Sequence, residues 1–99
     1  MEIELLYVAE CPNRRVARDR VERALARTRL AAMVHERVVR SSEEAVRLGM
    51  RGSPTILIDG VDPFADTAGP PALSCRLYRG EGGFGGAPTV DQLVEALAG

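Results

Sequence analysis

Two cysteines, Cys11 and Cys75, are the residues with which this sequence could perform chemistry. Cys11 is followed by Pro12 and comes shortly after an apolar segment, residues 2–8. A cysteine thiolate is the nucleophile in disulfide exchange and a good ligand for soft metals. Because His35 is the one histidine of the chain, an ordinary zinc site is not expected, and we interpret His35 as a surface or edge residue.

The residues around Cys11 predict a thiol with a lowered pKa. We expect residues 2–8 to form a strand and a helix to follow it up to about Leu30, with Pro12 as the first helical residue. Cys11 then lies in the N-cap region, where free backbone N–H groups and the helix dipole favour an anion. Arg14 adds a cation close by. This pattern predicts Cys11 as the attacking thiolate and Arg14 as a group that stabilises it.

A second motif follows the next predicted helix, where Ser53-Pro54-Thr55 opens a short β-branched strand. Together with Cys11-Pro12, this motif resembles the thioredoxin/glutaredoxin superfamily, in which a cysteine at the start of the first helix faces a cis-proline. The resemblance implies a thioredoxin-like α/β fold and a cis bond before Pro54. It also implies protein or small-molecule thiols and disulfides as partners, glutathione among them. The residues that it implies in substrate binding are Pro12, Ser53, Pro54 and Thr55. The alternative is that Ser53-Pro54 simply turns the chain into a strand.

The sequence departs from this superfamily at position 14, where Arg14 replaces the second cysteine of a Cys-x-x-Cys motif. Two routes stay open: a monothiol mechanism with an external thiol, or Cys75 as the resolving thiol. The segments Cys11-Pro12-Asn13 and Ser74-Cys75-Arg76-Leu77-Tyr78 resemble those of small bacterial thioredoxin-like proteins, some of them selenoproteins, which favours a redox role for Cys75. The alternative is that Cys75 is a small buried hydrophobic residue.

The leading hypothesis is therefore a thiol-disulfide oxidoreductase that needs no bound cofactor. A second hypothesis keeps the fold and uses the two thiolates to bind a soft metal or an organomercurial, for which sulfur ligands are selective. A third is a degenerate thioredoxin fold that acts only as a binding module.

The element order predicts one domain, residues 1–99, with a β-α-β-α-β-β-α order and a mixed four-stranded sheet flanked by helices. Residues 33–39 form the second predicted strand, and the turn signal Asp59-Gly60 is expected to add an antiparallel strand. Capping boxes at Ser41/Glu44 and Thr89/Gln92 start the later helices.

Residues 62–88 are harder to interpret. Leu73 to Arg79 is compatible with a strand or a short helix. We interpret the glycines between Gly80 and Gly85 as a flexible loop rather than as a dinucleotide site, because no β-α-β unit has room to follow them.

The composition is that of a globular protein, with 45 % hydrophobic and 27 % charged residues. A net charge of -1 argues against nucleic acid or an anionic membrane as the main partner. The sequence starts with a strand pattern and not with a signal peptide, and it has no run of apolar residues long enough to cross a membrane. We therefore expect a cytoplasmic protein, and the sequence makes no prediction of its oligomeric state.

Overall fold

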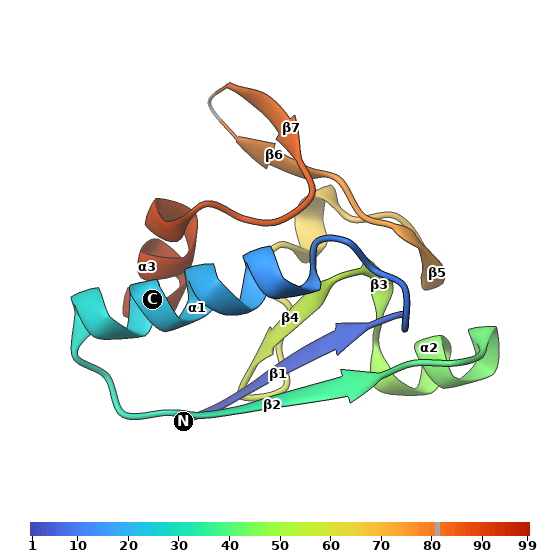
Figure 1. The fold of residues 1–99 in the computed structure, drawn as a ribbon, viewed down its shortest axis with the longest axis horizontal. Helices are drawn as coiled ribbons and strands as arrows, with labels where there is room; N and C mark the ends of the chain where they lie inside the picture. Colours follow the sequence, from blue (N-terminus) through green and yellow to red (C-terminus); the bar gives the residue numbers. More distant parts are fainter. Residues whose placement is uncertain (81) are drawn as a thin grey trace.

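The first half of the chain alternates strands and helices, as its sequence predicts (Figure 1). The computed structural model describes residues 1–80 and 82–99, and these ranges contain three α-helices and several small sheets. The elements are β1 (Glu2–Tyr7), α1 (Arg14–Thr28), β2 (Met33–Val38), α2 (Ser42–Leu48), β3 (Arg51–Ser53), β4 (Thr55–Ile58), the short 3-10 helix η1 (Ala65–Thr67), β5 (Ala72–Cys75), β6 (Tyr78–Gly80), β7 (Gly83–Gly85) and α3 (Val90–Ala98).

The largest sheet within the described residues has the strand order β2-β1-β4. β1 runs parallel to β2 and antiparallel to β4, so the expected mixture of parallel and antiparallel pairing is present. The expected fourth strand is not part of this sheet. Asp59 and Gly60, both at positive φ, make the predicted turn, but only an isolated bridge between Ile58 and Val61 follows it. The proline at position 63 has no N–H to donate to a sheet ladder, and the chain leaves the sheet there.

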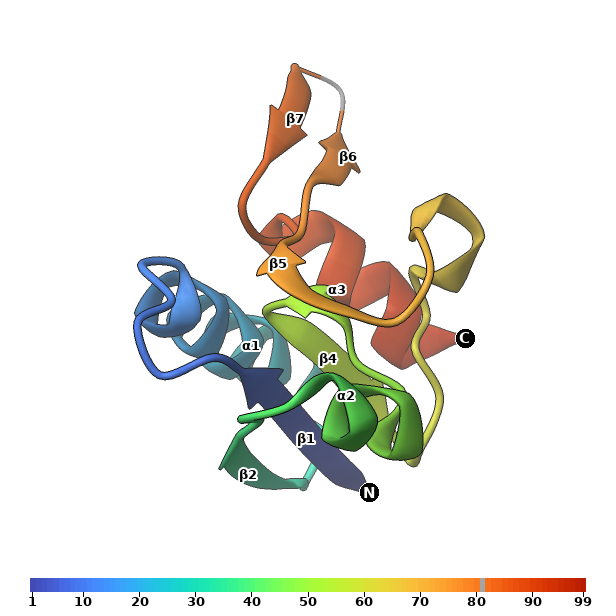
Figure 2. The ribbon, with the colours of Figure 1, turned by 90° about the vertical axis from the view of Figure 1, so that its right-hand side faces the viewer.

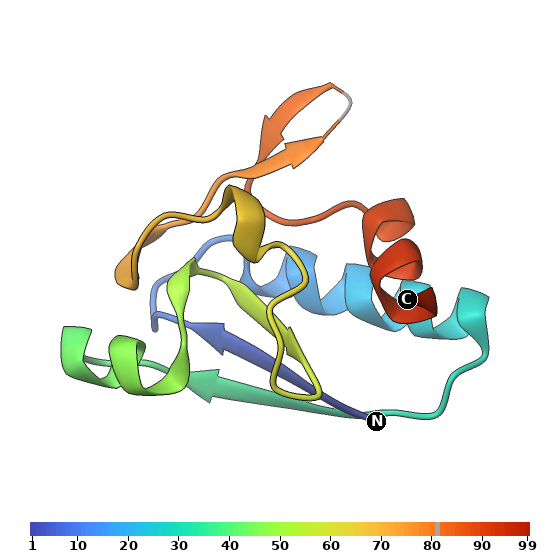
Figure 3. The ribbon, with the colours of Figure 1, turned by 180° about the vertical axis from the view of Figure 1, so that it is seen from behind.

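Helices cover both faces of this sheet. α1 and α3 lie side by side on one face, where Ile3 and Leu5 of β1 pack with Leu93 of α3 (Figures 1 and 3). Leu6 points to the other face, where it packs with Ala45 of α2. Because successive side chains of a strand point to opposite faces, burial of both Leu5 and Leu6 requires cover on both sides.

The helix caps agree with the sequence in part. Thr89 and Gln92 form the predicted capping box at the start of α3. The Ser41 side chain accepts the Glu44 N–H as expected, but the Glu44 carboxylate accepts the N–H of Arg40 instead of that of Ser41. α2 therefore has the predicted cap with a return contact shifted by one residue.

Residues 62–88 form extended structure around a short 3-10 turn. The segment that the sequence left open, Leu73 to Arg79, contributes to two strands, β5 and β6. β5 pairs in parallel with β3, and β6 pairs with β7 in a ribbon that projects away from the sheet (Figure 2). The predicted flexible loop is thus largely a β-ribbon, and its residue at position 81 lies outside the described residues.

Candidate functional site

Cys11 lies in the turn that connects β1 with α1 (Figure 1). Its N–H donates to the Val8 carbonyl over 3.0 Å, and its side chain is half-buried. α1 begins at Arg14 with Asn13 as its N-cap, so the prediction that Pro12 is the first helical residue is wrong. The reason is local: the turn from Val8 to Cys11 is followed by a second turn at Pro12 and Asn13 before the helix starts. Cys11 therefore precedes the cap, and the helix dipole acts on it from a greater distance than expected.

Arg14 is held beside the β1 end of the same turn. Its guanidinium donates to the Tyr7 hydroxyl over 3.1 Å and lies 4.9 Å from the centre of the Tyr7 ring. The pKa of Arg14 is raised, mainly by this hydrogen bond to Tyr7 and to a smaller extent by the neighbouring Glu36 carboxylate. Arg14 is thus a permanent cation held in place by Tyr7, in the same connection between β1 and α1 that contains Cys11.

Ser53 joins this turn to the rest of the structure. The Val8 N–H donates to Ser53 Oγ over 3.0 Å, and Ser53 itself has no exposed surface. The bond between Ser53 and Pro54 is cis. The Ser53 carbonyl accepts the backbone N–H of Arg76 over 3.0 Å, and the Thr55 hydroxyl donates to the Gly52 carbonyl over 2.6 Å. In this structure both side chains therefore bind their own chain, and a role for Ser53 and Thr55 in substrate binding remains a prediction.

Cys75 lies on the other side of Ser53. It ends β5, its thiol is exposed, and its Cα pairs with that of Ser53 across the β3–β5 ladder. The alternative interpretation, that Cys75 is a small buried residue, is therefore wrong. Gly52 allows this close approach, because a Cβ added at Gly52 would lie 2.9 Å from Cβ of Arg76 and 3.2 Å from the Ser74 carbonyl oxygen.

Both cysteines are free thiols, and the two segments that carry them both contact Ser53. The Cys11 turn contacts Ser53 through the N–H of Val8, and Cys75 pairs with Ser53 across the β3–β5 ladder. The structure thus brings four of the predicted site residues, Cys11, Ser53, Pro54 and Cys75, to one end of the molecule.

A buried cluster behind Pro54, which we name the Arg76 network, was not expected from the sequence. It consists of Arg76, Asp62, Phe64 and Tyr78. The Arg76 guanidinium donates to both carboxylate oxygens of Asp62, over 2.7 and 3.3 Å, and to the Phe64 carbonyl over 2.9 Å. The Arg76 and Asp62 side chains are only 3 % and 7 % exposed. This ion pair holds the residue that follows Cys75.

Tyr78 connects the Arg76 network to the cis-proline. Its ring lies 4.5 Å below the Arg76 guanidinium and edge-on to Phe64, and its hydroxyl donates to the Pro54 carbonyl. Burial raises the pKa of Tyr78, and the charges of Asp62 and Cys11 act in the same direction while Arg76 opposes them. The Ser-Cys-Arg-x-Tyr segment contains two residues of this network, but nothing in its spacing indicates Asp62 as their partner.

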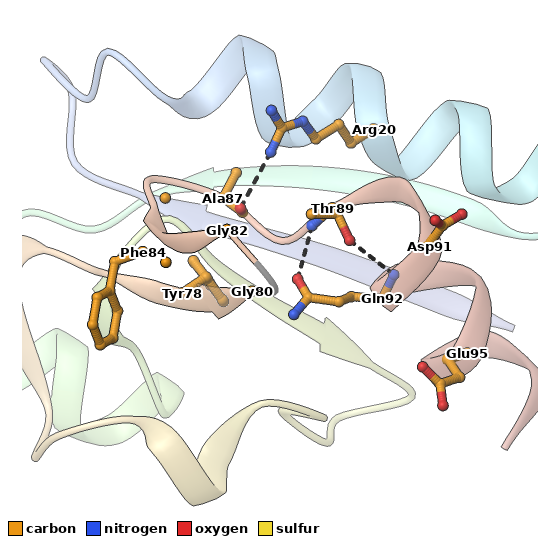
Figure 4. A pocket seen from close by; sticks show the side chains of 12 residues that line it. Arg20, Tyr78, Gly80, Gly82, Phe84, Ala87, Thr89, Asp91, Gln92 and Glu95 are labelled. Carbon is orange, nitrogen blue, oxygen red and sulfur yellow. Dashed lines mark hydrogen bonds between the residues drawn. The ribbon is translucent and has the colours of Figure 1, made fainter.

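Two grooves flank this region. The larger, of about 550 Å³, lies between the β6–β7 ribbon and α3 (Figure 4). Several of its polar groups bind one another: Arg20 donates to the Ala87 carbonyl, and the Thr89 N–H donates to Gln92. No cysteine is found among its described lining residues. The smaller groove, of about 370 Å³, is lined by Cys75.

The part of the chain that the structure describes offers no cluster of three or more His, Cys, Asp or Glu side chains for a metal ion. Over the same residues, no helix is long and apolar enough to cross a bilayer. His35 is exposed on the edge strand β2, as expected, and its Nε2 lies 2.8 Å from Glu2. Comparisons of the chain with models of protein families, with curated proteins and with solved structures found no match.

Proposed function

We propose that this protein is a thiol-disulfide oxidoreductase with a thioredoxin-like fold, in which Cys11 is the nucleophile and Cys75 the resolving thiol. The observation that carries the proposal is the position of Ser53. This buried serine binds the turn that bears Cys11 and pairs with Cys75 across a strand ladder. The two segments that carry the free thiols therefore meet at one buried residue, and this supports the proposal that the thiols act as a pair.

The fold that we propose is supported by its connectivity. β1 and β2 are parallel and joined by α1, β4 is antiparallel to β1, and helices cover both faces of the sheet. The cis bond before Pro54 opens β4 at the end of the sheet where the Cys11 turn lies. The three-stranded sheet among the described residues is a departure from the four strands expected of a thioredoxin fold.

The reaction proceeds by two exchanges. The Cys11 thiolate attacks one sulfur of a substrate disulfide, which breaks the S–S bond, releases one thiolate and leaves a mixed disulfide on Cys11. The Cys75 thiolate then attacks the Cys11 sulfur, releases the second substrate thiolate and forms a Cys11–Cys75 disulfide. Two equivalents of an external thiol reduce this disulfide and restore both thiols. Arg14 contributes a fixed positive charge near Cys11 and so favours the thiolate.

The test measures reduction of a small neutral disulfide by an external thiol, with the wild-type protein and with the variants Cys11→Ser and Cys75→Ser. We expect Cys11→Ser to abolish turnover. Cys75→Ser should accumulate the mixed disulfide on Cys11, which mass spectrometry detects. A redox titration should give the wild-type pair a potential in the range of roughly −120 to −270 mV.

Two results would overturn the proposal. A protein that stays reduced throughout the titration and binds Hg(II) tightly through both sulfurs is a soft-metal binder instead. A protein in which neither thiol reacts faster than a free cysteine is a binding module without thiol chemistry.

A further inference from the structure

The smaller groove is built around the exposed Cys75 thiol. Its walls come from three segments: β3 with Arg51 and Gly52, the loop around Pro70, and the end of β5 with Leu77 beyond it. Its volume of about 370 Å³ falls in the range of small-molecule sites. The described lining residues do not include Cys11, so this groove gives access to Cys75 alone.

The charges of this groove favour an anion. The described lining residues include no Asp or Glu. Arg76 is neutralised by its buried ion pair with Asp62, but Arg51 has no ion-pair partner among the residues that the structure describes. Arg51 is exposed and pairs with Ala72, on the same ladder in which Ser53 pairs with Cys75. A rise of about 3.3 Å per residue puts the two pairs roughly 7 Å apart along β3, within reach of an arginine side chain.

Resting on the function proposed above, we infer that this groove is the entry site of the reductant, and that the reductant is an anionic low-molecular-weight thiol. Arg51 binds its carboxylate, while Leu77 and Pro70 contact its apolar part. The thiol sulfur then meets Cys75. Substrate disulfides react at Cys11 and the reductant reacts at Cys75, so the two half-reactions use different surfaces.

The reduction step balances as two exchanges. A thiolate of the small thiol attacks the Cys75 sulfur of the Cys11–Cys75 disulfide, which releases the Cys11 thiolate and leaves the small molecule bound to Cys75 as a mixed disulfide. A second small thiolate attacks the small-molecule sulfur of that mixed disulfide. The products are the oxidised small disulfide and the Cys75 thiolate, so two thiols supply the two electrons.

The test isolates Cys75 in a Cys11→Ser background and measures its rate of mixed-disulfide formation. The probes are oxidised glutathione, which is anionic, and cystamine, which is cationic. We expect Arg51→Gln to lower the ratio of the anionic to the cationic rate by about fivefold at low salt, the size of effect typical of an exposed charge pair. High salt should remove most of this difference.

The matched control is Arg29→Gln, which removes the same charge at the far end of α1, on the opposite side of the molecule from β5 (Figure 1). This variant should leave the rate ratio unchanged. Equal ratios in the Arg51→Gln variant and in its parent would overturn the inference. Turnover of the wild-type protein is measured separately. If the wild type turns over but Arg51→Gln leaves the rate ratio unchanged, only the inference about the groove is refuted. If Arg51→Gln lowers the rate ratio but the wild type shows no turnover, only the proposed function is refuted.

Discussion

Cys11 is half-buried in a turn that is closed within its own segment, whereas Cys75 is exposed at the end of a short strand. The Cys11 turn is bounded by a buried strand and a helix, and Arg14 at the start of that helix is fixed by Tyr7. Cys75 depends on contacts between residues far apart in sequence: the pairing with Ser53 and the ion pair of Arg76 with Asp62. The comparison indicates that the two thiols should respond to different substitutions.

The largest effect is expected from Asp62→Asn, which leaves the Arg76 guanidinium buried without a counter-charge. Breaking a buried ion pair in this way costs about 3–5 kcal/mol of unfolding free energy. Since Arg76 follows Cys75 in the chain, we also expect the alkylation rate of Cys75 to rise above its wild-type value, and to rise by a larger factor than that of Cys11. Denaturant unfolding and thiol alkylation measure the two effects. Asp66→Asn, at an exposed position of η1, is the control and should change neither. A loss below about 1 kcal/mol would show that the pair does not stabilise this region.

Gly52→Ala should have the next largest effect. Gly52 has φ +97 and has no room for a Cβ beside Arg76, so an alanine must strain the backbone or push β5 away from β3. We expect a loss of about 1–3 kcal/mol in unfolding free energy. The Cys11–Cys75 disulfide should also become easier to reduce. Gly69→Ala, where nothing lies within 4 Å of the added Cβ, is the matched control. Equal stability of the two variants would contradict the close approach of the strands.

The burial of the Tyr78 phenol predicts that the unfolding free energy of the protein falls at alkaline pH. The pKa of Tyr78 is raised by burial, so the folded state keeps the phenol proton at a pH where the unfolded chain, with a pKa of about 10, loses it. The contribution of the Tyr78 phenol to the unfolding free energy is complete below about pH 10. It declines as the pH rises further, by up to about 1.4 kcal/mol per pH unit. Unfolding free energies at about pH 9 and about pH 11 measure it. Tyr78→Phe should show a smaller decline than wild type; an identical decline would rule out this phenol as its source.

The smallest effect is expected on the reactivity of Cys11. Arg14→Gln removes the cation near Cys11, and we expect alkylation of Cys11 at neutral pH to slow by about threefold to fivefold. Cys75 should react as before, because Arg14 lies three residues from Cys11 in the chain and the charges that act on it include Cys11 but not Cys75. Arg15→Gln is the control, since Arg15 is the next residue of α1, carries the same charge and is exposed. Slowing of both thiols in Arg14→Gln would indicate a general charge effect instead.

Much of the first half of the molecule could be predicted from the sequence because it is determined locally. The strand pattern of residues 2–8, the Ser41 cap and the Asp59-Gly60 turn each depend on neighbouring residues, and each lies where expected. The start of α1 was predicted too early, because a proline after a cysteine suits both a first helical residue and the turn that precedes a helix.

The sequence by itself determined the alternation of elements, the main caps and the two candidate thiols. Only the tertiary structure decided that Cys75 is exposed beside Ser53, that the sheet among the described residues stops at three strands, and that Asp62 neutralises Arg76. The reason is physical: caps and periodicity act over a few residues, whereas ion pairs and strand pairing join segments whose separation along the chain has no pattern. The two grooves belong to the second kind, because their walls come from segments that meet only in the folded chain.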